Sequence, residues 1–136
     1  RSHARGRRHA ATTALADGDA VANLEADAAY KMGRFAEARE RWEALAARGN
    51  TTAMINLANL YEQGQGVPVD AARAGAYTRD AAEAGDPRAQ YQLAMAYERG
   101  AGVPHDLDAA ARTWLERADA AGHPEAAAYL AGLDGE

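Results

Sequence analysis

The sequence contains no cysteine and few large apolar side chains. Its 136 residues include one Phe, two Trp and six Tyr, while alanine supplies most of the apolar 48%. The missing cysteines exclude a disulfide framework, a thiol nucleophile and a thiolate zinc site. Alanine favours helices but buries little area per residue, so we expect a thin core that is spread along a stack of helices.

Long apolar runs, serines and metal motifs are also scarce. No run reaches the roughly 20 apolar residues that cross a bilayer, so no membrane span is expected. No serine follows Ser2, which excludes a serine nucleophile. The four histidines have no metal-site spacing and no H-E-x-x-H motif occurs, so we expect no metal and no cofactor. The terminus Arg1-Ser2-His3 could bind Cu(II) or Ni(II), or it could be a remnant of cloning.

Charge is divided unevenly along the chain. The first nine residues, RSHARGRRH, carry four arginines and no acid. The remaining residues carry 11 basic and 20 acidic side chains, a net charge of −9, and the whole chain has −5. Because nucleic-acid affinity depends on neutralising phosphates, this acidic body argues against a nucleic-acid partner. The basic tail could bind nucleic acid, anionic lipid or an acidic protein, but we interpret it as a flexible linker.

The sequence repeats itself. LANLYEQGQGVPVD at residues 57–70 and LAMAYERGAGVPHD at residues 93–106 correspond at an offset of 36 residues. A glycine followed by Asn, Asp or His recurs with a similar period, at residues 18–19, 49–50, 85–86 and 122–123. Glycine favours the left-handed turn past a helix end, and Asn and Asp are strong N-caps. Each pair therefore predicts the end of one helix and the start of the next.

Apolar residues at three- and four-residue spacing follow each pair and predict amphipathic helices. One set is Ala22/Ala26/Tyr30, Ala53/Leu57/Tyr61, Ala89/Leu93/Tyr97 and Ala126/Leu130; the second helices carry Ala38/Trp42/Leu45, Ala74/Tyr77/Ala81 and Ala111/Trp114/Ala118. No segment alternates with period two, so no sheet is expected. Three helix pairs and a closing helix predict an all-α, right-handed α-solenoid, in which no unit buries its apolar face alone.

The pattern A-x-x-x-L-A-x-x-Y-x-x-G-x-G-V-P, followed by Asp, an alanine/aromatic helix and Ala-Gly-[Asp/His]-Pro, resembles the Sel-one-like repeats, relatives of the tetratricopeptide repeat. The resemblance covers residues 50–122 and the closing helix, whereas residues 19–49 resemble an ordinary tetratricopeptide unit. We predict a repeat domain over residues 17–136 and a disordered basic tail or linker over residues 1–16. The resemblance implies a bacterial scaffold for protein–protein contacts, in an extracytoplasmic setting. Some cysteine-rich relatives bind or hydrolyse β-lactams, but this chain lacks their cysteines.

The G-x-G loop could cradle a phosphate or separate two helices. A phosphate loop needs a preceding strand and a third glycine or a Lys-Ser/Thr pair, and the sequence offers neither. We therefore expect Gly64 to end a helix and Gly66 to allow a positive φ or a close backbone approach. Val67 should fill the gap between the helices and Pro68 should stop either helix from running on. The loop at residues 100–104 should do the same in the next unit.

Acidic pairs are the remaining candidates for catalysis. Glu37 and Glu40 lie among arginines on a helix, which indicates a solvated face. Asp106 and Asp108 begin a helix, where Asp106 is the expected cap. Neither pair predicts the cleft in which glycosidase carboxylates flank a sugar, so we do not expect an enzyme.

If the helix pairs stack as in tetratricopeptide arrays, the first helix of each pair lines a concave surface. The candidate partner-binding residues on that surface are Ile55, Asn59, Glu62, Arg88, Tyr91, Met95 and Arg99, with Leu24 and Lys31 extending it toward the N-terminus. An exposed trio of Ile55, Tyr91 and Met95 would suit an extended or helical peptide. The same trio could equally pack between units, and the spacing fits both interpretations.

Three functions fit these features. The favoured one is a non-enzymatic scaffold or adaptor that binds a protein or peptide in the concave groove. A second is a regulatory or targeting module of a larger protein, since a chain that begins with Arg1 rather than Met is expected to be processed or truncated. A third is a structural unit that self-assembles into homo-oligomers through the open end of the stack at Leu130 and Leu133.

Overall fold

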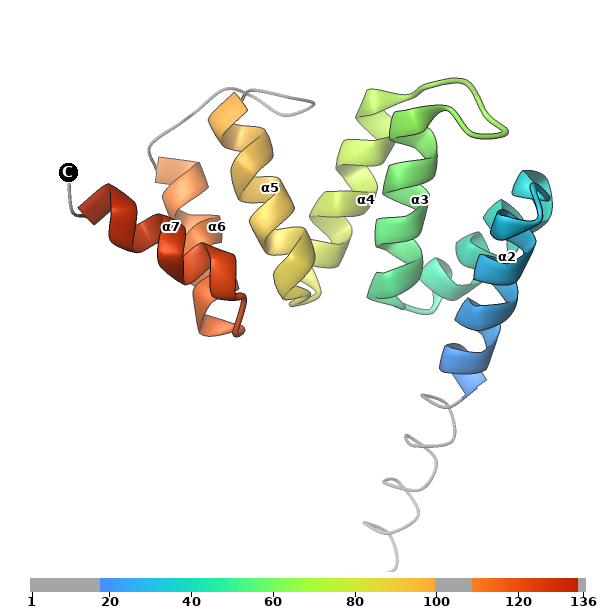
Figure 1. Cartoon of the computed structure of the whole chain (residues 1–136), viewed down its shortest axis with the longest axis horizontal. Coiled ribbons are helices and arrows are strands. Elements are labelled where there is room, and N and C mark those ends of the chain that lie inside the picture. Colours follow the sequence, from blue (N-terminus) through green and yellow to red (C-terminus); the bar gives the residue numbers. More distant parts are fainter. Residues whose placement is uncertain (1–17, 100–108, 135–136) are drawn as a thin grey trace, which may run out of the picture.

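The computed structural model of the chain describes residues 18–99 and 109–134, with side chains within 18–99 and 111–132. All secondary structure in these ranges is helical, which confirms the predicted all-α solenoid (Figure 1). The helices are a first helix at residues 18–31, α2 (Phe35–Ala47), α3 (Thr51–Gln63), α4 (Ala71–Glu83), α5 (Pro87–Arg99), α6 (Ala109–Ala120) and α7 (Pro124–Asp134). Figure 1 shows them in one row, each running back along its predecessor.

Side-chain caps start the helices where the sequence predicts them. The Asn50 side chain accepts the N–H of Ala53 at 2.9 Å and begins α3. Asp70 accepts an N–H at the start of α4 at 3.0 Å, and Asp86 does so for α5 at 3.4 Å. His123 caps α7 through Nδ1, which accepts a backbone N–H at 3.4 Å. The cap predicted at residue 106 lies outside the described residues.

Glycines end the helices in the left-handed conformation. Gly49, Gly85 and Gly122 have φ values of 89°, 99° and 93°, which glycine adopts without steric cost. The prediction of the same role for Gly18 is wrong, because the first helix already includes that residue. Asp19 is therefore helical rather than a cap, and its carboxylate forms an ion pair instead with Arg48, the residue directly after α2.

The glycine loop of the unit α3–α4 has the predicted structural role. Gly64 ends α3 at φ 71° and Gly66 has φ 75°. A Cβ added to Gly66 would lie 2.5 Å from the Cβ of Phe35, so the loop backbone presses closely on α2. Val67 is partly buried against the core, as expected. The corresponding loop of the next unit, residues 100–104, falls outside the described residues.

The core runs along the stack as three clusters, as the alanine-rich composition predicts. The first joins the first helix to α2 and α3 around Trp42 and Leu57. The second joins α3, α4 and α5 around Ile55 and Leu93. The third joins α5, α6 and α7 around Leu115. The largest fully buried side chains are leucines, and no helix in the described residues is long and apolar enough to span a bilayer.

Candidate functional site

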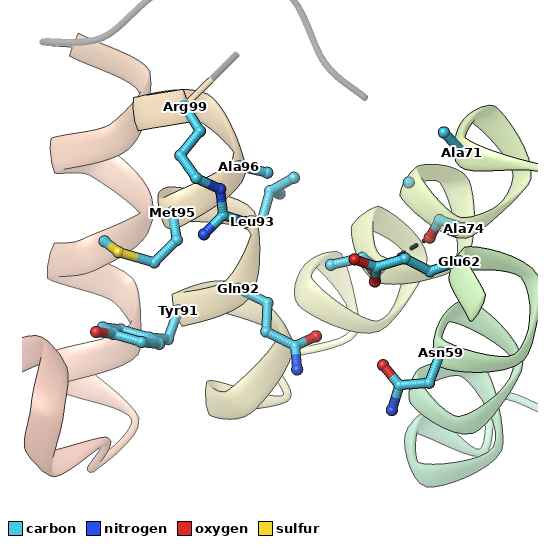
Figure 2. A pocket seen from close by; sticks show the side chains of 12 residues that line it. Asn59, Glu62, Ala71, Ala74, Tyr91, Gln92, Leu93, Met95, Ala96 and Arg99 are labelled. Atoms are coloured by element: carbon cyan, nitrogen blue, oxygen red, sulfur yellow. Dashed lines mark hydrogen bonds between the residues drawn. The ribbon is translucent and has the colours of Figure 1, made fainter. Parts of the chain in front are cut away.

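A cleft of about 400 Å³ opens between α3, α4 and α5 (Figure 2). Its lining residues are Asn59 and Glu62 of α3; Ala71, Ala74, Gly75 and Thr78 of α4; and Tyr91, Gln92, Leu93, Met95, Ala96 and Arg99 of α5. The cleft therefore lies where two successive repeat units meet, and each unit contributes one wall.

The floor of the cleft is built from small side chains of α4. Ala71, Ala74, Gly75 and Thr78 are spaced by three or four residues, which places them along one face of the helix. The Thr78 hydroxyl donates a hydrogen bond to the backbone oxygen of Ala74 at 3.1 Å, so its polar group is already used. A ligand backbone could approach this floor closely, because no side chain beyond the methyls of Ala and Thr stands in the way.

The walls of the cleft carry polar groups. Figure 2 shows the carboxamides of Asn59 on α3 and Gln92 on α5 directed into the space between these two helices. Glu62 adds an acidic group to the α3 wall and Arg99 adds a cation to the α5 wall. All four side chains are exposed, and none has a hydrogen-bond or ionic partner among the described residues. They are available to bind a ligand.

The structure brings together five of the seven residues predicted as the groove: Asn59, Glu62, Tyr91, Met95 and Arg99 line the cleft, and Ile55 and Arg88 do not. Ile55 is 7% exposed and packs in the core cluster with Ala81 and Leu93. Of the two interpretations of Ile55, packing between units is therefore correct and exposure in the groove is wrong.

Tyr91 and Met95 border the cleft, but their side chains also pack between units. Figure 2 shows them directed away from Asn59 and Glu62, toward the C-terminal helices. Both pack on the third core cluster, and the Tyr91 ring stacks on His123 with the ring centres 4.5 Å apart. Burial raises the pKa of Tyr91, and the carboxylates of Glu125 and Glu98 raise it further. Of the two interpretations that the spacing left open for Ile55, Tyr91 and Met95, the structure therefore favours packing between units.

Arg88 joins two units instead of facing the cleft. Its Nη2 donates to Thr52 of α3 at 3.2 Å and to the Asp86 carboxylate at 3.0 Å. Thr51 also donates to Asp86, at 2.9 Å. Burial alone would raise the pKa of Asp86, but the hydrogen bonds from Arg88 and Thr51 outweigh it and lower that pKa. This network fixes the start of α5 against α3.

Sequence reasoning missed Gln92, Ala96 and the α4 floor. The prediction took the groove from the first helix of each pair, at positions outside its buried apolar face. It left out the face that the second helix of the pair, here α4, turns toward the cleft. One usable signal was Gly75, because a glycine inside a helix costs about 1 kcal/mol relative to alanine and often marks a close approach.

Two predicted features stay untested. Leu130, offered for self-assembly, is partly buried against the third core cluster, and the side chain of Leu133 lies outside the described ones. Among the described residues, no three His, Asp or Glu side chains gather in a way that could hold a metal ion.

A family model described as "Sel1 repeat" matches residues 51–86 and 87–123. Each match begins with the first helix of a pair, α3 or α5, and ends on the cap of the next such helix. The two matches together cover more than half of the chain. No curated protein matches the sequence.

Solved bacterial structures have the same fold. A Sel1 repeat protein from Oxalobacter formigenes superposes with a TM-score of 0.67 and 29% identity, over 76% of this chain and 42% of that one. Cysteine rich protein B of Helicobacter pylori gives 0.66 and 20%, over 68% and 69%. A protective antigen of uropathogenic Escherichia coli strains, displaying an SLR fold, gives 0.65 and 32%, over 85% and 25%. The chain thus spans about two fifths of the Oxalobacter protein's length.

Proposed function

The chain belongs to the Sel1 repeat family, and from this premise we propose that it is a non-enzymatic scaffold that holds a protein partner in the cleft between α3, α4 and α5. Sel1-repeat proteins are in general protein-interaction scaffolds. One observation supports the cleft most directly. Two repeat units present exposed carboxamides, Asn59 and Gln92, toward a common space over a floor of small side chains.

A polypeptide segment in extended conformation fits this chemistry. Its backbone N–H and C=O groups need partners, and each carboxamide offers both a donor and an acceptor. The small side chains of the α4 floor allow the segment to approach. A volume of about 400 Å³ is within the range of ligand-binding sites, roughly 300–1,000 Å³. The opposite charges of Glu62 and Arg99 on the two walls would favour a segment with a basic side chain toward α3 and an acidic side chain toward α5.

Of the two acidic pairs considered for catalysis, Glu37 and Glu40 give no competing site, and Asp106 and Asp108 lie outside the described residues. Glu37 pairs with Arg41 at 3.3 Å and lies 3.9 Å from Arg34, so it belongs to a charged helix surface. Glu40 is exposed on the same helix, α2. Members of the family are in general non-catalytic scaffolds.

Affinity capture with a matched control tests the proposed function. Immobilised wild type, the double variant Asn59→Ala/Gln92→Ala and the control Gln63→Ala are exposed to lysate of the source organism, and bound proteins are quantified by mass spectrometry. Gln63 is an exposed amide of α3 that does not line the cleft. We expect a partner that binds wild type and the control and is depleted with the double variant. Equal capture by all three folded proteins would place the interaction elsewhere and refute the cleft.

A further inference from the structure

A stripe of exposed apolar residues runs along the first helix. The large apolar side chains exposed in the described residues are Val21 at 54%, Leu24 at 69%, Met32 at 67% and Val69 at 67%. With 3.6 residues per turn, positions 21, 24, 28 and 32 lie along one side of a helix. We call Val21, Leu24 and Ala28 of the first helix, together with Met32 in the turn directly after it, the apolar stripe; at 1.5 Å per residue it is about 16 Å long.

The register of the repeat places the apolar stripe on the same side of the solenoid as the cleft. The core-facing residues of the first helix, buried or partly buried, match those of α3 at an offset of 31 residues: Ala22 with Ala53, Ala26 with Leu57 and Tyr30 with Tyr61. In this register Leu24 corresponds to Ile55, and Ala28 corresponds to Asn59. Since Asn59 forms part of the α3 wall of the cleft, the stripe extends the same surface toward the N-terminus.

The apolar stripe is open where the equivalent positions further along the chain are covered. Ile55 is 7% exposed because it packs with residues of α4 and α5. Tyr91, the next equivalent, is partly buried and stacks on His123. Leu24 stays 69% exposed although α3 follows it in the stack. The first unit therefore presents to solvent a position that the other units use for packing.

Ion pairs border the apolar stripe and leave its centre uncharged. Lys31 binds Asp27 at 2.8 Å on the first helix. Glu25 binds Arg41 of α2, also at 2.8 Å. The charged side chains beside the stripe are thus paired within the chain, and the stripe itself contains only apolar residues. An apolar centre with a polar rim is the usual anatomy of a protein-binding surface.

The size of the cleft indicates that a protein bound there needs more contact area. A specific protein–protein interface buries about 800 Å² on each partner, whereas a cleft of about 400 Å³ holds a ligand the size of a small molecule. We propose that the apolar stripe is the second half of the binding surface and takes an amphipathic helical segment of the protein whose extended residues enter the cleft. The inference rests on the proposed function.

A helical occupant follows from the shape of the apolar stripe. It is a row of side chains along one helix, and a second helix with apolar residues at i, i+3 or i+4, and i+7 presents a matching row. Large side chains on that helix would cover Leu24 and Val21, while its polar face would stay in solvent.

A random 20-residue peptide library displayed on phage serves as the probe. Peptides enriched on wild type are synthesised, and their dissociation constants are measured by fluorescence anisotropy. The variants are Leu24→Glu, Val69→Glu and Asn59→Ala/Gln92→Ala. Val69 is the matched control, an aliphatic residue with 67% exposure that lies outside the stripe. Leu24→Glu should weaken binding about 30-fold or more, as expected for a hot-spot residue, and Val69→Glu should change it less than about twofold.

The outcomes separate this inference from the proposed function. Loss of affinity with both Leu24→Glu and the Asn59/Gln92 double variant, with apolar residues at helical spacing in the peptides, supports the inference. Loss with the cleft variant alone overturns it and leaves the proposed function standing. Loss with Leu24→Glu alone overturns the shared surface and the cleft together. Failure to enrich any peptide overturns the inference as well. The melting temperatures of Leu24→Glu and of the milder Leu24→Ala are measured as well, and a loss of affinity counts only for a variant that melts like wild type.

Discussion

Substituting alanine for Gly66 should destabilise the protein more than the same substitution at Gly33. Both glycines have positive φ, 75° and 80°. Their surroundings differ, however. A Cβ on Gly66 would lie 2.5 Å from the Cβ of Phe35, whereas a Cβ on Gly33 would meet nothing within 4 Å. The pair therefore separates the cost of the left-handed backbone from the cost of the contact between the glycine loop and α2.

The expected magnitudes follow from these two terms. A non-glycine residue in the left-handed region costs about 1–2 kcal/mol, and the lower entropy of the unfolded chain offsets about 0.4–1 kcal/mol of it. Gly33→Ala should therefore cost about 1 kcal/mol. The Cβ of Phe35 is fixed to the α2 backbone and cannot rotate away. Gly66→Ala should then add an overpacking cost of about 1–3 kcal/mol.

Urea denaturation followed by circular dichroism at 222 nm measures both variants, with the free energy extrapolated linearly to water. Equal losses of stability would refute the reasoning, because they would mean that the loop is free to move off α2. The variant Phe35→Ala should not relieve the clash in Gly66→Ala, since it keeps the Cβ. Phe35→Gly removes that atom, so a double-mutant cycle with Gly66→Ala should show favourable coupling.

Three further predictions concern the caps, the unit interface and the cleft. Acid should destabilise wild type more than Asp86→Asn. Burial alone would raise the pKa of Asp86, but hydrogen bonds from Arg88 and Thr51 hold it below its usual 3.8. The carboxylate therefore makes its full contribution to the free energy of unfolding above that pH and loses it as the pH falls below. Leu93→Ala should lower the free energy of unfolding by about 2–5 kcal/mol, and Tyr91→Ala should lower it by about 1–3 kcal/mol. If Tyr91→Ala melts like wild type, the Tyr91 ring does not pack between the units. Thr78→Leu should fold, because Leu115 holds the equivalent position, but abolish partner capture; retained capture would contradict the cleft.

Helices and their ends were predictable because local interactions decide them. A cap such as Asn50 binds an N–H three residues away, and Gly49 turns the chain at the preceding helix end. The repeat also predicted the role of Gly66, although not its contact with Phe35, which belongs to another helix pair. The prediction for Gly18 was wrong, because the position of a helix end depends on residues on both of its sides. Asp19 is helical, and its carboxylate pairs with Arg48 instead of capping a helix.

The candidate site was only partly predictable. Spacing shows which residues share a face of one helix, but not how far two neighbouring helices are tilted or how deep a side chain sits between them. Ile55 and Tyr91 therefore fitted both an exposed and a packed interpretation, and the structure has them packed. Gln92 was missed because it lies next to the buried residue Leu93, and spacing alone does not show that its side chain faces the space beside Asn59 of the preceding unit.

The cleft lies between α3 and α5 because that junction departs from the repeat. Its floor needs the small residues Gly75 and Thr78. The equivalent positions hold larger side chains, Arg39 and Trp42 in the preceding pair and Arg112 and Leu115 in the following one. Trp42 and Leu115 are 2% and 1% exposed, so they fill the space that Thr78 leaves open. The shared residues of the repeat thus build the stack, while the residues that differ between units open the cleft that we propose as the binding site for a partner's backbone.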